Sequence, residues 1–276
     1  MTSGPIAQSQ PLDQATIDAP TLSARAFEPH TRSVFLDAGL EPGMRVLDAW
    51  SGSGDVALIA REIVGPYGHV TGFDGSPASV GYAGERARSR DYDNVDFLVA
   101  DVSSLPFGVE FDAIVGRVVL MYRLDPVADL RALVSCLKPG GLVVFQETDL
   151  LSGKTVPPAP VVEEVRTWML DAFAQAGIEM EMGHKLYQTF KAAGLPAPDM
   201  EIDGFIGGVE DVSPALFANV IRMLLPHLEA LGVATADKVQ IDTLEQRMRA
   251  DLARTGGVMS TPLLIAAWTR LPLQRS

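Results

Sequence analysis

The stretch from Met44 to Ile63 constrains the fold of this 276-residue chain more than any other. A short apolar run, Met44 to Leu47, is followed by Asp48-Ala49-Trp50-Ser51-Gly52-Ser53-Gly54 and then by apolar residues at helical spacing: Val56, Ile59, Ala60 and Ile63. A buried strand, a glycine turn and a helix in this order form the first unit of a parallel α/β sheet. Glycine suits the turn because it tolerates positive φ and lets the backbone approach a ligand closely.

The glycine pattern alone also fits a dinucleotide site, but two carboxylates argue against one. Asp48 ends the first strand, where its charge would repel a pyrophosphate and favour a cationic ligand. Asp74 ends the next predicted strand, which runs from His69 to Asp74. A carboxylate at this distance from the glycines can accept hydrogen bonds from both hydroxyls of a ribose.

Further strands are predicted at Asn94–Ala100, Phe111–Gly116 and Leu142–Phe145, with amphipathic helices between them. This alternation predicts a doubly wound, Rossmann-like sheet. Weaker strand patterns at 200–206 and 263–271 bring the expected, mostly parallel sheet to seven strands. Ligands bind such sheets at the carboxyl ends of the strands, where Asp48, Asp74, Asp101, Arg117 and Glu147 all fall.

The remaining segments suggest one domain with helical additions. Residues 1–20 are expected to form a mobile arm, and residues 21–276 a single domain. Helical lid elements are predicted over 21–39, 151–195 and 210–255, with Pro226 breaking or kinking the last of these. Arg25 and His30, in the first lid helix, are expected to be solvated or capping residues.

The composition excludes several classes of function. A net charge of −13 and a pI near 4.7 make a nucleic-acid partner improbable. Cys136 is the only cysteine, which excludes an intramolecular disulfide and a cysteine zinc cluster, and we expect it to be a buried hydrophobe. The sequence has neither a membrane-length apolar run nor a signal-peptide pattern, so we expect a cytoplasmic protein without a membrane partner. We expect no metal site.

Taken together, these motifs resemble class I S-adenosylmethionine-dependent methyltransferases, in particular the small-molecule group. The similarity is good over residues 39–149 and loose elsewhere. It rests on Val46–Gly54, Gly72-Phe73-Asp74, Asp101-Val102, Leu105-Pro106-Phe107 before Phe111-Asp112, and Leu137-Lys138-Pro139-Gly140-Gly141. The resemblance implies S-adenosylmethionine as the cofactor, a sulfonium without phosphate that suits an acidic crevice.

The resemblance also suggests which residues hold the cofactor. Asp48 would offset its positive charge, Asp74 would bind the ribose, and Asp101 would accept from the adenine amino group. The complete expected set is Asp48, Trp50, Gly52, Gly54, Asp74, Gly75, Ser76, Asp101, Val102 and Arg117. Trp50 departs from the family pattern, acid-x-Gly-x-Gly-x-Gly, because it replaces the first glycine. Its ring either packs beside the sheet or enters the methionine pocket and reshapes it.

Methyl transfer requires mainly alignment of acceptor and methyl group, with a base only for a poorly ionised acceptor. His184, after Gly183 at a predicted helix start, is the preferred base, although a solvated histidine fits the same pattern. Tyr122 is the second catalytic candidate. Residues expected to contact the acceptor are Met121, Tyr122, Glu147, Asp149 and His227.

We therefore expect methyl transfer to a small, largely apolar metabolite, at oxygen in preference to nitrogen or carbon. A secondary-metabolism substrate and a homodimer are compatible with these patterns. A non-methylating cyclase on the same scaffold and a catalytically silent binding subunit remain alternatives. An NAD-dependent oxidoreductase ranks below them because no Tyr-Lys pair for hydride transfer is recognisable.

Overall fold

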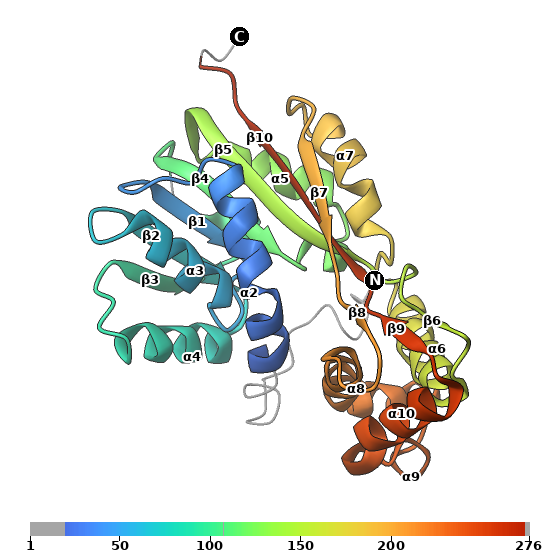
Figure 1. Cartoon of the computed structure of the whole chain (residues 1–276). Helices are drawn as coiled ribbons and strands as arrows, with labels where there is room; N and C mark the ends of the chain where they lie inside the picture. Colours follow the sequence, from blue (N-terminus) through green and yellow to red (C-terminus); the bar gives the residue numbers. More distant parts are fainter. Residues whose placement is uncertain (1–19, 107, 274–276) are drawn as a thin grey trace.

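The computed structural model describes residues 20–106 and 108–273, so the expected arm over 1–20 lies almost entirely outside the described residues. Its main element is a seven-stranded sheet in the order β3-β2-β1-β4-β5-β10-β7 (Figure 1). Strands β3 to β5 run parallel, and β10 is antiparallel to both neighbours. The expected Rossmann-like, mostly parallel sheet is confirmed. Its strands are β1 (Arg45–Ala49), β2 (His69–Asp74), β3 (Val95–Val99), β4 (Phe111–Arg117), β5 (Leu137–Asp149), β7 (Asp199–Asp203) and β10 (Leu263–Arg270).

Helices cover both faces of this sheet, each over its own apolar core. Helices α2 (Pro20–Asp37), α3 (Asp55–Val64) and α4 (Pro77–Arg88) lie on one face. Helices α5 (Pro126–Val134) and α7 (Met182–Ala192) lie on the other, which holds the larger core. The short helices η1 (Val102–Ser104) and η2 (Leu120–Tyr122) follow β3 and β4 at the carboxyl edge.

Helix starts follow the capping signals of the sequence. The Ser76 hydroxyl accepts from the Ser79 N–H at 3.3 Å, immediately before Pro77. Asp125 caps α5 in the same manner through the Ala128 N–H, at 2.9 Å. Both sites combine an N-cap side chain with proline at the first helical position. Helix α8 (Ser213–Ala230) continues through Pro226 without a break.

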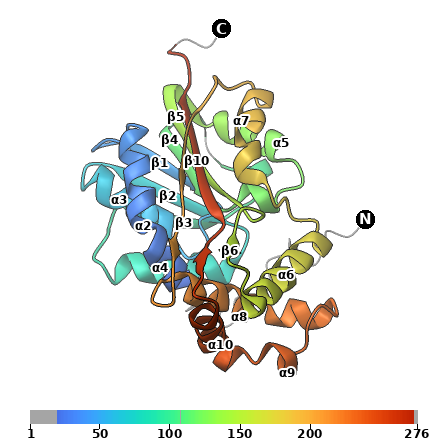
Figure 2. The same ribbon diagram turned by 45° about the vertical axis from the view of Figure 1, so that its right-hand side comes forward.

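A second part of the molecule is joined to the carboxyl edge of the sheet (Figures 1 and 2). It contains a small antiparallel sheet in the order β6-β9-β8, which was not predicted because its strands are too short to show a periodic pattern. The chain enters it from the end of β5, leaves it after α6 to form α7 and β7, and re-enters at β8. It returns into β10, whose Leu263 pairs with Asp149. Its elements are β6 (Lys154–Val156), α6 (Pro160–Gln175), β8 (Ile206–Gly207), α8, α9 (Ala236–Val239), α10 (Ile241–Thr255) and β9 (Val258–Ser260).

Two expectations about the whole chain can be compared with the described residues. Cys136 is 3% exposed and lies in the larger core, which confirms that it is a buried hydrophobe. Within residues 20–106 and 108–273, no helix has both the length and the apolarity needed to cross a membrane.

Candidate active site

Three residues of the turn between β1 and α3 have positive φ, namely Trp50, Gly52 and Gly54. Gly52 has φ 51° and Gly54 has φ 81°, as expected for glycine. A Cβ on Gly54 would lie 2.9 Å from Cζ of Phe97, so this glycine is needed for packing against β3. A Cβ on Gly52 would meet no heavy atom of the described residues within 4 Å. The turn is therefore closed on the Gly54 side and open at Gly52, as a ligand cradle requires.

Asp74 fastens this turn to the loop after β2. Its Oδ2 accepts a hydrogen bond from the Gly52 N–H at 3.0 Å, and its Oδ1 accepts from the Ser76 N–H at 2.8 Å. Gly75 lies between Asp74 and Ser76 in the sequence, and a Cβ there would meet no heavy atom of the described residues within 4 Å. One carboxylate thus holds two loops together at the point where the helices α3 and α4 begin, and each helix start favours negative charge.

Asp48 and Arg117 lie deeper, on neighbouring strands. Asp48 is 1% exposed, and burial raises the pKa of its carboxyl well above the usual value, although the Ala57 N–H and Arg117 oppose the shift. Its Oδ2 has no hydrogen-bond partner among the described residues. Burial likewise lowers the pKa of Arg117, whose guanidinium donates to Thr31 Oγ1 of α2 at 2.8 Å.

The Trp50 ring packs beside the sheet, which is the first of the two positions considered for it. Its centroid lies 5.5 Å from that of Phe73, and the Arg123 guanidinium lies 4.7 Å from the ring centroid. The backbone nevertheless keeps the conformation that glycine would adopt, because Trp50 has φ 52°. For a residue with a Cβ this conformation costs roughly 1–2 kcal/mol.

Asp101 and Val102 follow β3 at the same edge. The exposed Asp101 caps η1 by accepting from the Ser103 N–H at 2.9 Å and from the Ser103 hydroxyl at 2.7 Å. These hydrogen bonds lower the pKa of Asp101, so it is ionised at neutral pH. Val102 is buried in the larger core, which leaves the Asp101 carboxylate as the accessible polar group of the pair.

The Glu147 side chain binds the backbone of the turn after β4. It is fully buried, and its carboxylate accepts from the N–H groups of Val119 (2.9 Å) and Leu120 (2.7 Å), with a longer contact to Met121 (3.3 Å). Burial raises its pKa to about 7 despite these donors. Tyr122, in the same turn, is 36% exposed, yet surrounding protein and the nearby Glu147 raise the pKa of its hydroxyl to about 12. Met121 is buried in the core.

Where β5 ends and α7 begins, Oδ2 of Asp149 contacts Nδ1 of His184. The Asp149 side chain is 8% exposed and its Oδ1 accepts from the Leu151 N–H, whereas the His184 side chain is 61% exposed. With Nδ1 directed at Asp149, Nε2 is the ring nitrogen of His184 that remains for another hydrogen-bond partner. His227 lies apart from this pair, on α8.

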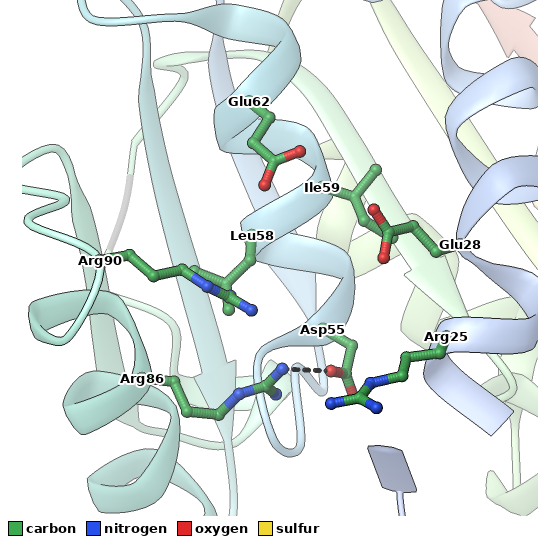
Figure 3. Close-up of a pocket in the computed structure, with 8 residues that line it drawn as sticks. All are labelled: Arg25, Glu28, Asp55, Leu58, Ile59, Glu62, Arg86 and Arg90. Carbon is green, nitrogen blue, oxygen red and sulfur yellow. Dashed lines mark ion pairs between the residues drawn. The ribbon is translucent and has the colours of Figure 1, made fainter. Parts of the chain in front are cut away.

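A polar groove of about 250 Å³ lies beside the glycine turn, among helices α2, α3 and α4 (Figure 3). It is lined by three arginines and three acids as well as two apolar side chains, namely Arg25, Glu28, Asp55, Leu58, Ile59, Glu62, Arg86 and Arg90. Arg86 forms an ion pair with Asp55 at 2.7 Å and donates to the Ser53 carbonyl. These contacts join α4 to the glycine turn and to the start of α3.

Comparison with known proteins decides the family. Residues 40–194 match the family described as the methyltransferase domain, which is more than half of the chain. This chain belongs to that family. The fold, the glycine turn and the resemblance drawn from the motifs all agree with it, and the chain is an S-adenosylmethionine-dependent methyltransferase acting on a small molecule.

Two curated methyltransferases and one solved structure are similar to this methyltransferase. Over 188 residues it is 43% identical to the 2-phytyl-1,4-naphtoquinone methyltransferase of Synechococcus elongatus, covering 66% of this chain and 73% of the relative. It is 32% identical over 144 residues to the demethylmenaquinone methyltransferase of Staphylococcus aureus, covering 51% and 56%. Among solved structures, the cyclase SpnF aligns with a TM-score of 0.53 at 23% identity, covering 91% of this chain and 82% of that one. This last likeness shows the fold alone.

The residues at the carboxyl edge of the methyltransferase fit its cofactor. Open space above Gly52 and Gly75 gives the cradle, and Asp74 and Asp101 supply acceptors for hydroxyl and amino groups. No group of three or more histidine, cysteine or acidic side chains in the part of the chain described here could hold a metal ion.

Sequence reasoning misjudged one polar side chain that is buried in this methyltransferase and missed another. The expectation that His30 is solvated or capping is wrong, because its side chain is 7% exposed and its Nδ1 lies 3.4 Å from Asp203 Oδ2. Gln146 on β5 was not considered, although it is fully buried. Its one signal in the sequence is a polar residue that interrupts the apolar run Leu142–Phe145 before Glu147.

Proposed function

We propose that this methyltransferase transfers a methyl group to an oxygen of a small, largely apolar aromatic acceptor of the hydroquinone type. The observation that supports this best is the pairing of Asp149 with His184 at the end of β5, because a carboxylate-oriented imidazole can take the proton of a hydroxyl. The names of the two quinone methyltransferase relatives support the acceptor class.

Cofactor binding falls, in this proposal, to the carboxyl ends of β1, β2 and β3. When bound, S-adenosylmethionine supplies a methyl group activated by a positively charged sulfur. Gly52 leaves room for it, Asp74 accepts from the ribose hydroxyls and Asp101 accepts from the adenine amino group. The remaining residues assigned to this site are Asp48, Trp50, Gly54, Gly75, Ser76, Val102 and Arg117.

Acceptor binding falls to the turn after β4 and the end of β5. Glu147 fixes the backbone of η2, which positions Tyr122 at the edge. His184 accepts the hydroxyl proton at Nε2, held by Asp149. Met121 and His227 complete the assigned acceptor residues, and segments 21–39, 151–195 and 210–255 form a lid that excludes water.

Methyl transfer to reduced 1,4-naphthoquinone (1,4-naphthohydroquinone) tests this function. The protein is incubated with this probe and S-adenosylmethionine carrying a ¹³C-labelled methyl group, and the product is examined by mass spectrometry and ¹³C NMR. We expect a product heavier by one methyl group, with the chemical shift of a methoxy carbon. Absence of any methylated product would contradict the proposal.

Transfer to a ring carbon of the same acceptor class is the second candidate. It is favoured by the quinones named in the two relatives, because a quinone carries carbonyl oxygens and no hydroxyl. The same NMR spectrum separates the two, since a methyl group on a ring carbon has a different shift from a methoxy group.

A further inference from the structure

Helix α4 lies directly against the glycine turn between β1 and α3. A Cβ on Gly54 would lie 3.0 Å from the Ala83 Cβ, which shows how closely this helix approaches the turn. Arg86 follows Ala83 by three residues and therefore lies on the same face of α4. Figure 3 shows its guanidinium directed at Asp55, at the start of α3. The helix thus brings a positively charged side chain to the turn.

Arg86 forms a closed set of contacts with Ser53 and Asp55. Its Nη1 donates to the Ser53 carbonyl at 2.5 Å, and its Nη2 lies 2.7 Å from Asp55 Oδ1. The Ser53 hydroxyl donates to the other oxygen of that carboxylate, Oδ2, at 2.7 Å. The side chains of Arg86 and Asp55 are 20% and 14% exposed, so these charge-assisted contacts are largely shielded from water. Each of the three residues is therefore held by the other two.

Asp74 and Arg86 hold neighbouring residues of the same turn. The Gly52 N–H donates to Asp74, and the carbonyl of the next residue, Ser53, accepts from Arg86. Asp74 also accepts from the Ser76 N–H before α4, so both holding side chains come from β2 and the helix that follows it. A glycine backbone is freer than that of other residues. Contacts of this kind are therefore needed to keep the turn in one conformation.

We propose that Arg86 is a positioning residue for the amino-acid part of S-adenosylmethionine, because it fixes the turn through the Ser53 carbonyl. The inference rests on the proposed cofactor site, in which Asp74 and Asp101 bind the ribose and the adenine. The amino-acid part of the cofactor is then left to the turn, where Gly52 gives it room. Misplacement of a binding group by about 1 Å can cost about 100-fold, so a residue that acts only through the backbone can still control affinity.

The test compares Arg86→Met with the unmodified protein on two ligands, S-adenosylhomocysteine and 5′-methylthioadenosine. The second ligand has the same nucleoside but lacks the amino-acid part. Isothermal titration calorimetry gives both dissociation constants. We expect Kd for S-adenosylhomocysteine to rise about tenfold, and Kd for 5′-methylthioadenosine to change by less than about twofold. A general weakening of the fold would raise both constants by the same factor.

Two further variants separate positioning from loss of stability. Arg61→Met removes a comparable set of contacts, because Arg61 of α3 donates to the Asn94 side chain at 2.9 Å and lies 4.0 Å from the Tyr92 ring centroid. It should lower the melting temperature and leave the ratio of the two dissociation constants unchanged. Arg86→Lys keeps the charge beside Asp55 but lacks the fork of the guanidinium. It should show the same selective loss with a melting temperature closer to that of the unmodified protein.

Two results would overturn the inference alone. In the first, both Arg86 variants bind S-adenosylhomocysteine as tightly as the unmodified protein does. In the second, they lose affinity for the two ligands by the same factor, which would make Arg86 a structural residue. If Arg86→Met does not fold, Arg86→Lys decides between these outcomes and the selective loss. If the unmodified protein binds neither ligand, the proposed cofactor site fails and the inference falls with it.

Discussion

The Asp74 carboxylate accepts a hydrogen bond from the backbone N–H of Gly52 at 3.0 Å, which joins the end of β2 to the turn after β1. Because the same carboxylate also accepts from Ser76, the two loops that face the cofactor share one anchor. This anchor keeps a negative charge at the edge of the sheet, where the ribose hydroxyls need an acceptor. In the proposed cofactor site, Asp74 would therefore supply both the shape of the two loops and the negative charge.

Replacement of Asp74 by asparagine should weaken binding of S-adenosylhomocysteine about 10- to 100-fold, because hydrogen bonds to a charged group are worth about 1.5–3 kcal/mol. Isothermal titration calorimetry measures the affinity. The exposed Asp93→Asn controls for the lost charge and should bind normally. Equal affinity of Asp74→Asn and the unmodified protein would remove Asp74 from the site.

Alanine substitutions at Gly54 and Gly52 should have different effects: the first should lower mainly the free energy of unfolding, and the second mainly the affinity for the cofactor. Gly54→Ala places a Cβ 2.9 Å from Phe97 and 3.0 Å from the Ala83 Cβ at φ 81°, so we expect a loss of about 2 kcal/mol or more in the free energy of unfolding. Gly52→Ala meets open space, so its loss should be limited to about 1–2 kcal/mol of backbone strain while cofactor binding falls. Urea unfolding and calorimetry check both variants. Equal losses of stability would contradict this assignment.

Burial of Glu147 predicts a pH dependence of stability. Its pKa is raised from the usual 4.5 to about 7, a difference worth roughly 3 kcal/mol. Below pH 4.5 the carboxyl is protonated in both states. As the pH rises from 4.5 to 7, it ionises in the unfolded state first, so the free energy of unfolding falls, and above pH 7 this contribution is constant.

Urea unfolding at several pH values, compared between the unmodified protein and Glu147→Gln, isolates this contribution. The variant should show a decline between pH 4.5 and 7 that is smaller by roughly 3 kcal/mol; a part remains because burial raises the pKa of Asp48 as well. The exposed Glu201→Gln should retain the full decline. A decline of unchanged size in Glu147→Gln would assign the pH dependence to another group.

Trp50 should tolerate glycine better than alanine. Both substitutions remove the contacts with Phe73 and Arg123, but only glycine adopts φ 52° without strain. We expect Trp50→Gly to be more stable than Trp50→Ala by about 1 kcal/mol. At the exposed Val99 of β3, where φ is not positive, the order should reverse. Urea unfolding distinguishes the two outcomes, and a more stable Trp50→Ala would show that the backbone relaxes.

Replacement of His184 by glutamine should lower kcat for the hydroquinone about 100-fold, as loss of a general base does, while affinity for S-adenosylhomocysteine is unchanged. His69→Gln is the matched control, because His69 also pairs with an aspartate, Asp96 at 3.1 Å, far from the carboxyl edge. Steady-state kinetics over a range of pH gives both values. If both variants retain full kcat, His184 is a surface histidine.

Local patterns were sufficient to predict the succession of strands and helices along the chain, because glycine turns, N-caps and apolar periodicity act over a few residues. The boundaries were less exact: the predicted strand Leu142–Phe145 belongs to β5, which extends from Leu137 to Asp149. Two-residue and three-residue strands such as β8 depend on tertiary pairing and leave no periodic signal.

Some site residues could likewise be predicted from local patterns, whereas others depend on tertiary packing. Asp74 and Asp101 were recognisable because they end strands of the sheet. The burial of His30 and Gln146 arises only when helices pack against the sheet. The positive φ of Trp50 is a similar case, because the sequence pattern does not show it.

A crystal structure of the protein with S-adenosylhomocysteine tests the central claim most directly. The account predicts that the ribose hydroxyls lie within hydrogen-bond distance of Asp74, that the adenine amino group lies near Asp101 and that the amino-acid part rests over Gly52. A nucleoside bound away from the carboxyl ends of β1 and β2, for instance in the groove lined by Arg25 and Arg86, would contradict it.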